Sequence, residues 1–244
     1  MKTPTPARVV NAVRSRTSLV VRRLANLAGL EVHRDSEARD YWDDRSARYL
    51  DETRPILDPV DPYYQAQKVF LDRLQGMEWT SALEVGCGFG WHLKAIRCAF
   101  PERRMAGLDF SFGQLQQART YLADRSVGLF QSSAFSLPHR DRAFDLVFTS
   151  GLLVCIHPDC LPDVMREIAR VTKRHVVLLE YAREHIETPE QLAIMQTAAW
   201  HGHWFGPALE GAGLHVEESF VFPSFANDRG RVPLSCFRAT RRPL

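Results

Sequence analysis

The sequence predicts an α/β fold in which a mostly parallel sheet is covered by helices on both faces. Between residues 82 and 181, short apolar runs alternate with helical patterns, as in doubly wound sheets. The first run, Ala82–Val85, ends in the turn Gly86-Cys87-Gly88-Phe89-Gly90 and leads into a helical pattern from Trp91 to Phe100. Glycines at every second position let the backbone adopt positive φ and let a ligand approach it closely. Turns of this kind, at the carboxyl end of a parallel strand, bind nucleotides in open α/β sheets.

The other elements follow the same alternation. Phe144–Thr149 is the most apolar run, which is typical of a central buried parallel strand. Helices are expected from Asp61-Pro62 to about Leu74, at Ser111–Ala123, at Leu161–Thr172 and within the histidine-bearing segment 189–213. The last two expected strands form an antiparallel pair. In full, the expected strands are Ala82–Val85, Arg104–Leu108, Val127–Gln131, Phe144–Thr149, His175–Leu179, His215–Phe222 and Leu234–Thr240.

Residues 1–60 are expected to form an N-terminal helical extension and lid, and residues 61–244 the main domain. Apolar residues recur near helical spacing from Val9 to Leu30, with arginines between them and no acidic residue before Glu31. Such a basic amphipathic helix could pack on the domain, join two subunits into a homodimer, or bind a partner or a membrane surface. A second helix, Tyr41–Leu50, carries aromatic side chains that could close over a bound ligand or pack in the core.

Composition excludes several classes of partner and site. The net charge of +2 and the absence of a strongly basic core argue against a nucleic-acid substrate. The five cysteines are odd in number and form no CxxC pair, which argues against a disulfide framework and a structural zinc site. A reducing, cytoplasmic location is therefore expected. No apolar run approaches the roughly 18–20 residues that span a bilayer, so stable membrane insertion is not expected.

The glycine turn alone leaves two nucleotide cofactors open. The dinucleotide fingerprint G-x-G-x-x-G places its third glycine one position later than Gly90, so NAD fits less well. Asp109 ends the second expected strand, where a carboxylate can accept two hydrogen bonds from a ribose cis-diol. Together with the stretches Gln131–Pro138, Phe144–Phe148 and Arg170–Lys173, these motifs resemble, in order, those of class I S-adenosylmethionine (SAM)-dependent methyltransferases.

The resemblance implies a Rossmann-like fold and SAM as the cofactor. Where many members of the family have an aspartate that holds the adenine amino group, this chain has Ser133. The cofactor-binding residues that the resemblance implies are Glu84, Gly86, Cys87, Gly88, Gly90, Asp109, Phe110, Ser133, Ala134, Ser150 and Gly151.

A narrower resemblance concerns the acceptor. The stretches Gly151–Pro162, Lys173-Arg174 and Glu180-Tyr181 are similar to those of small methyltransferases associated with pseudaminic-acid and other surface-sugar biosynthesis. This resemblance implies O-methylation of a small molecule in sugar or specialised-metabolite biosynthesis. After the fourth strand, Thr149-Ser150-Gly151-Leu152 replaces the Pro-Pro-aromatic loop with which amino-methylating nucleic-acid enzymes hold a flipped base.

Three residues are candidates for catalysis. Methyl transfer to a hydroxyl requires a base, and histidine titrates near neutrality, so His157 and His201 are candidates. Tyr181 could orient the acceptor, and no metal site is expected. The alternatives are N-methylation of a small molecule, a non-catalytic SAM-binding or docking subunit, and a nicotinamide-dependent oxidoreductase.

Overall fold

The computed structural model describes residues 35–195, 201–226 and 231–241. The chain divides into two compact units, Met1–Arg39 and Asp40–Leu244. The first is described only from Asp35, where helix α3 (Asp35–Glu52) begins. The expected basic helix between Val9 and Leu30, and with it the expected homodimer contact, lies outside the described residues.

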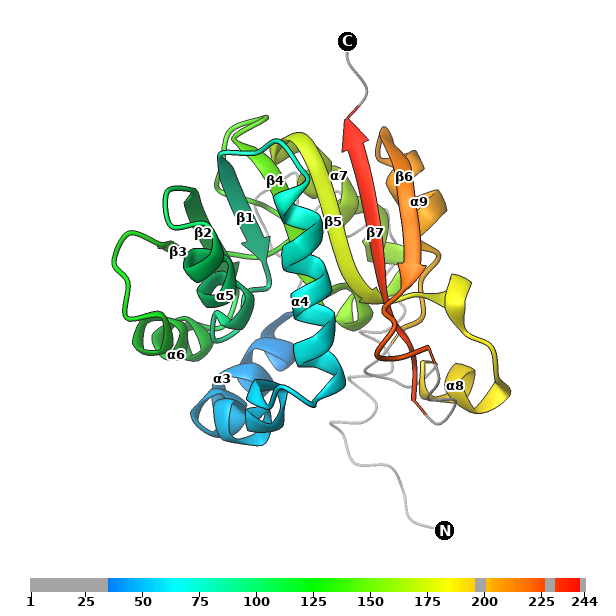
Figure 1. The fold of residues 1–244 in the computed structure, drawn as a ribbon, viewed down its shortest axis with the longest axis horizontal. Coiled ribbons are helices and arrows are strands. Elements are labelled where there is room, and N and C mark those ends of the chain that lie inside the picture. Colours follow the sequence, from blue (N-terminus) through cyan, green and yellow to red (C-terminus); the bar gives the residue numbers. More distant parts are fainter. Residues whose placement is uncertain (1–34, 196–200, 227–230, 242–244) are drawn as a thin grey trace, which may run out of the picture. The chain divides into compact units, whose positions relative to one another are not determined.

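The second unit is built on a seven-stranded sheet with the order β3-β2-β1-β4-β5-β7-β6 (Figure 1). Among the described strands, β7 is antiparallel to both of its neighbours, β5 and β6, and the other pairs are parallel, so the predicted seven-stranded, mostly parallel sheet with an antiparallel C-terminal pair is confirmed. The strand order reverses between β1 and β4, and ligands bind beside such a switch point in open α/β sheets. The strands are β1 Ser81–Val85, β2 Arg104–Asp109, β3 Gly128–Gln131, β4 Phe144–Ser150, β5 Thr172–Tyr181, β6 Leu214–Val221 and β7 Leu234–Arg241.

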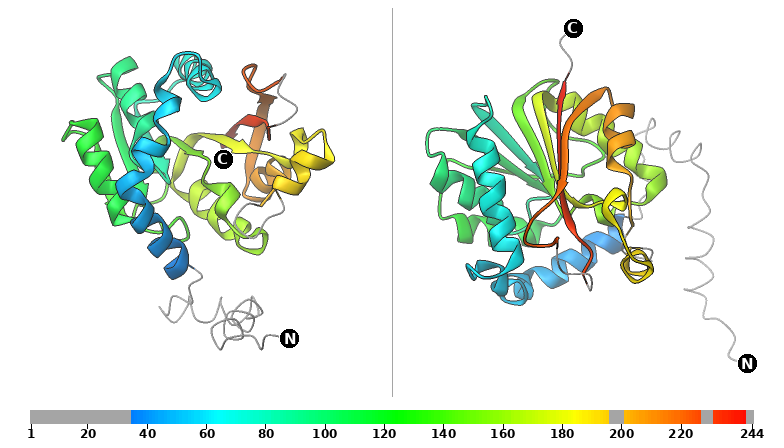
Figure 2. Two further views of the ribbon diagram at one scale, coloured as in Figure 1. Left: turned by 90° about the horizontal axis from the view of Figure 1, so that it is seen from below. Right: turned by 45° about the vertical axis from the view of Figure 1, so that its right-hand side comes forward.

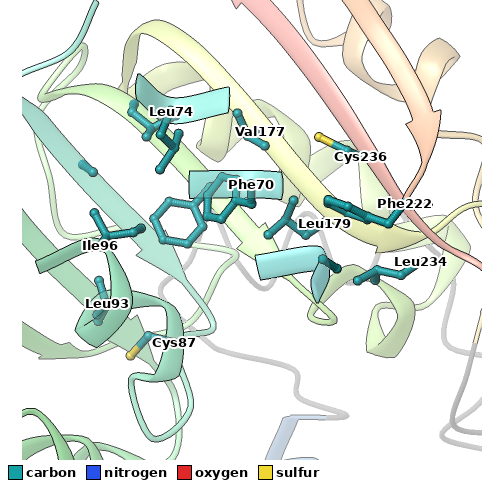
Figure 3. Packing of buried hydrophobic residues seen from close by; sticks show 14 of the residues in the cluster. Phe70, Leu74, Cys87, Leu93, Ile96, Val177, Leu179, Phe222, Leu234 and Cys236 are labelled. Atoms are coloured by element: carbon teal, nitrogen blue, oxygen red, sulfur yellow. The ribbon is translucent and has the colours of Figure 1, made fainter. Parts of the chain in front are cut away.

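Helices cover both faces of the sheet. Helices α4 (Pro62–Gln75), α5 (Trp91–Ala99) and α6 (Phe112–Leu122) bury apolar residues on one face, whereas α7 (Leu161–Val171) and α9 (Phe205–Gly211) do so on the other. Figure 3 shows Phe70 and Leu74 of α4 lying over Val177 and Leu179 of β5. Alternate residues of β5 belong to the two cores, as the period of a strand requires. Among the described residues, no helix combines the length and apolar character needed to cross a bilayer.

Local capping signals explain where two helices begin. The Asp61 side chain accepts a hydrogen bond from the Tyr63 amide at 2.8 Å, and Pro62 occupies the first position of α4. The Ser111 hydroxyl accepts one from the Gln114 amide at 3.1 Å at the start of α6. Both caps lie where the sequence predicts helix starts.

The expectation of a helical segment over residues 189–213 is only partly correct. The described part holds two short helices, α8 (Pro189–Ile194) and α9, and residues 201–204 between them are not helical. The backbone there pairs with distant segments instead: the His201 amide donates to the Val154 carbonyl at 2.8 Å, and the Arg183 amide donates to the His203 carbonyl at 2.9 Å. These bonds fix the histidine segment against the ends of β4 and β5.

Two glycines should respond oppositely to replacement by alanine. A Cβ at Gly107 of β2 would lie 2.6 Å from Leu93 Cδ1 and 2.8 Å from Cys87 Sγ, so Gly107→Ala should overpack the core and lower the free energy of unfolding by about 1–3 kcal/mol. A Cβ at Gly211 of α9 would meet no atom of the described residues within 4 Å, so Gly211→Ala should stabilise the chain by up to about 1 kcal/mol. Urea unfolding of both variants measures the difference, and equal midpoints would contradict the packing at Gly107.

Candidate active site

The glycine turn between β1 and α5 is held against the end of β2. The amides of Gly86 and Cys87 both donate to the Leu108 carbonyl, at 2.7 and 2.9 Å. Gly86, Gly88 and Gly90 have φ of 75°, 50° and 83°, which L side chains rarely adopt. A Cβ at Gly88 would lie no nearer than 3.9 Å to any side-chain atom of the described residues, whereas one at Gly86 would lie 2.8 Å from Leu152 Cδ1. Gly88 therefore leaves the backbone open, and Gly86 allows close packing against the loop after β4.

Asp109 lies beside this turn as a buried carboxyl. Its Oδ2 accepts from the Gly88 amide and its Oδ1 from the Ser111 amide, each at 2.9 Å. Burial raises the pKa of Asp109 to about 6, although the amides that donate to it act in the opposite direction. The structure thus fixes the carboxyl group directly at the glycine turn.

Glu84, at the end of β1, is a second buried carboxyl at this position. Only 2% of it is exposed, and its Oε2 has no hydrogen-bond partner among the described residues. Burial, together with the charge of Asp109, raises the pKa of Glu84 well above its ordinary value. Within the described part of the chain, neither Glu84 nor Asp109 forms an ion pair with a basic side chain. A ligand that carries positive charge would offset the cost of burying these two groups.

The remaining predicted cofactor residues lie along the same edge of the sheet. The Ser132 amide donates to the Asp109 carbonyl at 3.1 Å, which places the following residues, Ser133 and Ala134, beside the end of β2. At the end of β4, the Gly151 amide donates to the Leu179 carbonyl at 3.0 Å, and a Cβ at Gly151 would meet no atom of the described part of the chain within 4 Å. The predicted set therefore occupies the carboxyl ends of β1, β2 and β4 and the loop after β3: Glu84, Gly86, Cys87, Gly88, Gly90, Asp109, Phe110, Ser133, Ala134, Ser150 and Gly151.

His92 lies at this edge of the sheet, although the sequence analysis did not predict it as a site residue. Its Nε2 lies 3.0 Å from the Ser150 hydroxyl, and its Nδ1 lies 3.4 Å from the Gln67 side-chain nitrogen. Burial lowers the pKa of His92 to about 3, so the ring is neutral. His92 thereby orients Ser150 from α5. Its position two residues after Gly90 is a local signal that could have indicated proximity to the turn.

The candidate catalytic residues lie at the ends of β4 and β5 and in the segment after α8. The ring centroids of His157 and His201 are 5.4 Å apart. His157 Nδ1 accepts from the Asp159 amide at 3.3 Å and thus caps a short 3₁₀ turn, Pro158–Cys160. Tyr181 is 7% exposed, and its hydroxyl lies 2.5 Å from that of Tyr63 on α4. Burial raises the pKa of Tyr181 well above its ordinary value, so it remains a phenol at neutral pH.

His203 has a structural role. Its Nε2 lies 2.9 Å from both the Leu153 and the Ile156 carbonyl oxygens, so this nitrogen carries the proton and donates to them. The side chain is buried and links the segment after α8 to the loop after β4. Among the described residues, no group of three or more histidine, cysteine or acidic side chains is placed to hold a metal ion.

Glu180, at the end of β5, binds the loop after β4 through hydrogen bonds. Its Oε1 accepts from the Thr149 hydroxyl at 2.8 Å and from the Leu152 and Leu153 amides at 3.0 and 3.1 Å. Its Oε2 is buried and has no hydrogen-bond partner among the described residues. Burial raises the pKa of Glu180 to about 7, against the effect of the groups that donate to it.

Helix α3, drawn in blue in Figure 2, contacts the glycine turn through Tyr49. The rings of Tyr49 and Phe89 pack edge to face with centroids 5.9 Å apart. The Arg45 guanidinium lies over the rings of Tyr41, Trp42 and Tyr49, at 5.8, 5.4 and 5.0 Å from their centroids. The aromatic side chains of α3 thus surround its own arginine as well as covering the turn.

Part of the chain is similar in sequence to known proteins. Residues 82–175 match the family model described as a methyltransferase domain. A malonyl-acyl carrier protein O-methyltransferase of Legionella pneumophila is 35% identical over 91 residues, which are 36% of this chain and 31% of that protein. The matched region is therefore about a third of the relative's length.

Solved structures share the fold over most of the chain. A chain of the complex between the Haloferax volcanii Trm112 methyltransferase activator and a methyltransferase superposes with a TM-score of 0.66 at 21% identity, covering 83% of this chain and 98% of that one. Magnesium protoporphyrin IX methyltransferase from Synechocystis, solved with bound S-adenosylhomocysteine, gives 0.64 at 15% identity, with coverage of 85% and 100%. Residues 82–175 accordingly match a methyltransferase domain, and the described chain has the fold of these solved methyltransferases.

Proposed function

We propose that this chain binds SAM at the glycine turn and transfers its methyl group to an oxygen atom of a small-molecule acceptor. The supporting observation is the pair of buried carboxyls, Glu84 and Asp109, beside a turn whose Gly88 backbone is open. SAM has two positively charged groups, an ammonium and a sulfonium, and one negatively charged carboxylate. Its net positive charge therefore suits this acidic site. The diphosphate of NAD would face two carboxyl groups instead.

The proposed contacts follow from position along the sheet edge. Asp109 accepts hydrogen bonds from the ribose hydroxyls. Glu84 Oε2, which has no hydrogen-bond partner among the described residues, accepts from the ammonium group, directly or through water. Phe110, Ser133 and Ala134 contact the adenine ring. The methionine part lies along Gly86, Cys87, Gly88 and Gly90, and Ser150 and Gly151 line the sulfonium side.

The acceptor is proposed to lie between α3, α4 and the loop after β4. When bound, SAM supplies an already activated methyl group, so the protein's contribution is mainly alignment. His157, or the neighbouring His201, takes the proton of the acceptor hydroxyl, and the Tyr181 hydroxyl orients the acceptor. Residues 1–60 are proposed to act as an N-terminal extension and lid on the methyltransferase domain of residues 61–244.

Oxygen is favoured as the acceptor atom because the Legionella relative is named an O-methyltransferase. The stretches that resemble surface-sugar methyltransferases favour an acceptor in sugar or specialised-metabolite biosynthesis.

Titration calorimetry with SAM, S-adenosylhomocysteine and NAD tests the cofactor assignment. We expect micromolar binding of the first two, a free energy near −8 kcal/mol, and no heat from NAD. Binding of NAD alone would overturn the assignment.

A second assay follows methyl transfer from labelled SAM to a panel of small alcohols, sugars and carboxylates, with amines as the contrasting set. Labelled amines without labelled oxygen acceptors would overturn the choice of oxygen, and binding without transfer would favour a non-catalytic SAM-binding subunit.

A further inference from the structure

Helix α3 is joined to the start of α6 by a carboxylate. Asp43 Oδ1 accepts a hydrogen bond from the Ser111 hydroxyl at 2.5 Å and another from the Gly113 amide at 3.1 Å. The first amides of a helix have no partner within the helix, so an acceptor from another element satisfies one of them here. A carboxylate is also stabilised at a helix N-terminus by the helix dipole.

The contact between α3 and the start of α6 depends on the absence of a side chain at Gly113. A Cβ there would lie 2.3 Å from Ser46 Oγ, 2.9 Å from Ser46 Cβ and 3.3 Å from the Asp43 carbonyl oxygen. Ser46 is buried, and Gly113 is not among the glycines with positive φ. Glycine is therefore required at position 113 for the close approach of α3 and not for an unusual backbone conformation.

This contact adjoins the cofactor site through Ser111. The Ser111 amide donates to Asp109, the proposed ribose ligand, while its hydroxyl donates to Asp43. Further along α3, Tyr49 Cε1 lies 3.9 Å from the position of a Cβ on Gly88. Helix α3 is thus held near its middle, at Asp43, by Ser111, which also contacts the Asp109 carboxyl, and six residues later it approaches Gly88 with Tyr49.

We propose that Asp43 and Ser46, with Ser111 and Gly113, form a latch that holds α3 over the bound cofactor, and that cofactor affinity depends on this latch. Asp43 and Ser46 are positioning residues in this inference: they act through α3 and do not contact the ligand themselves. The inference rests on the proposed binding of SAM at the glycine turn. With the latch closed, α3 excludes water from the turn and retards release of the ligand.

The test uses Gly113→Ala and a compensating change, Ser46→Gly, which removes the side chain that the new methyl group would strike. In a helix, alanine is normally favoured over glycine, so a loss of affinity caused by Gly113→Ala would point to the contact with α3. We expect Gly113→Ala to weaken S-adenosylhomocysteine binding about tenfold or more. The double variant Ser46→Gly/Gly113→Ala should recover most of this loss. Asp43→Ala should weaken binding similarly, whereas Asp44→Asn, at an exposed neighbouring position, should not.

Hydrogen exchange of residues 40–52 without ligand provides a second readout. Gly113→Ala and Asp43→Ala should speed exchange of the α3 amides, and the double variant should slow it again. Unchanged affinity in Gly113→Ala and Asp43→Ala, with binding intact in the unaltered chain, would overturn the latch and leave the proposed function standing. Failure of Ser46→Gly to rescue Gly113→Ala would also overturn it. Absence of binding by the unaltered chain would overturn the proposed function itself, and with it the dependence of affinity on the latch.

Discussion

Replacing Asp109 with alanine is expected to weaken S-adenosylhomocysteine binding by about a hundredfold or more. A carboxylate that accepts two hydrogen bonds from the ribose hydroxyls contributes about 3 kcal/mol in total, since hydrogen bonds to charged groups contribute about 1.5–3 kcal/mol each. The side chain also holds the Gly88 and Ser111 amides, so its loss loosens the turn that receives the ligand. Titration calorimetry at pH 8, where the carboxyl is ionised, measures the effect.

The matched control is Asp72→Ala, which removes an exposed aspartate from α4. It should leave affinity unchanged. Circular dichroism at the temperature of the titration separates lost binding from lost folding in Asp109→Ala. A folded Asp109→Ala variant with the affinity of the unaltered chain would show that the ribose is bound elsewhere.

The pKa of Asp109 also predicts how ligand affinity and folding stability depend on pH. Its pKa is about 6 in the folded chain, above the ordinary value of 3.8, because burial disfavours the charged form. Protonation of Asp109 therefore contributes to the free energy of unfolding of the unliganded chain. This contribution is fully present below about pH 4 and is lost as pH rises through about 6. Ligand hydroxyls favour the carboxylate, so affinity should fall as pH drops below about 6. Affinity that stays constant between pH 8 and 5 would contradict this assignment.

The second large effect is expected at Glu180. Glu180→Ala would leave the Thr149 hydroxyl and the Leu152 and Leu153 amides without their shared acceptor. Each buried donor left without an acceptor costs about 1–3 kcal/mol, and three donors lose theirs, so the urea midpoint should fall steeply. The loop after β4 should then lose its fixed position beside the proposed acceptor site.

Glu180→Gln is the discriminating variant. Its amide oxygen can accept the same three hydrogen bonds, and it carries no buried charge, so its stability at pH 8 should equal or exceed that of the unaltered chain. The pKa of Glu180 is about 7 in the folded chain, above the ordinary value of 4.5, because the carboxyl group is buried. The unaltered chain should therefore lose about 3 kcal/mol relative to Glu180→Gln as pH rises from about 4.5 to about 7. A Glu180→Gln variant as unstable as Glu180→Ala would show that the side chain does not act as an acceptor for this loop.

Much of the fold follows from signals that act over a few residues. Asp61 and Ser111 cap helices within three positions of themselves, and Gly86, Gly88 and Gly90 mark a turn through their spacing alone. Asp109 could be assigned to the site because parallel strands end at one edge of a sheet. The histidine segment was the exception, since its backbone pairs with Val154 and Arg183 in place of forming a helix.

The sequence by itself determined the α/β class, the glycine turn and the carboxyl that adjoins it, because hydrophobic periodicity, capping and glycine spacing are local properties. Only the tertiary structure decided that β7 lies between β5 and β6, that Glu180 serves the Leu152 and Leu153 amides, and that Asp43 meets Gly113. These contacts join residues far apart in the chain, and they form only when the helices and the sheet have packed together. A glycine needed for space, such as Gly113, cannot be told from any other glycine until its neighbour, Ser46, is in place.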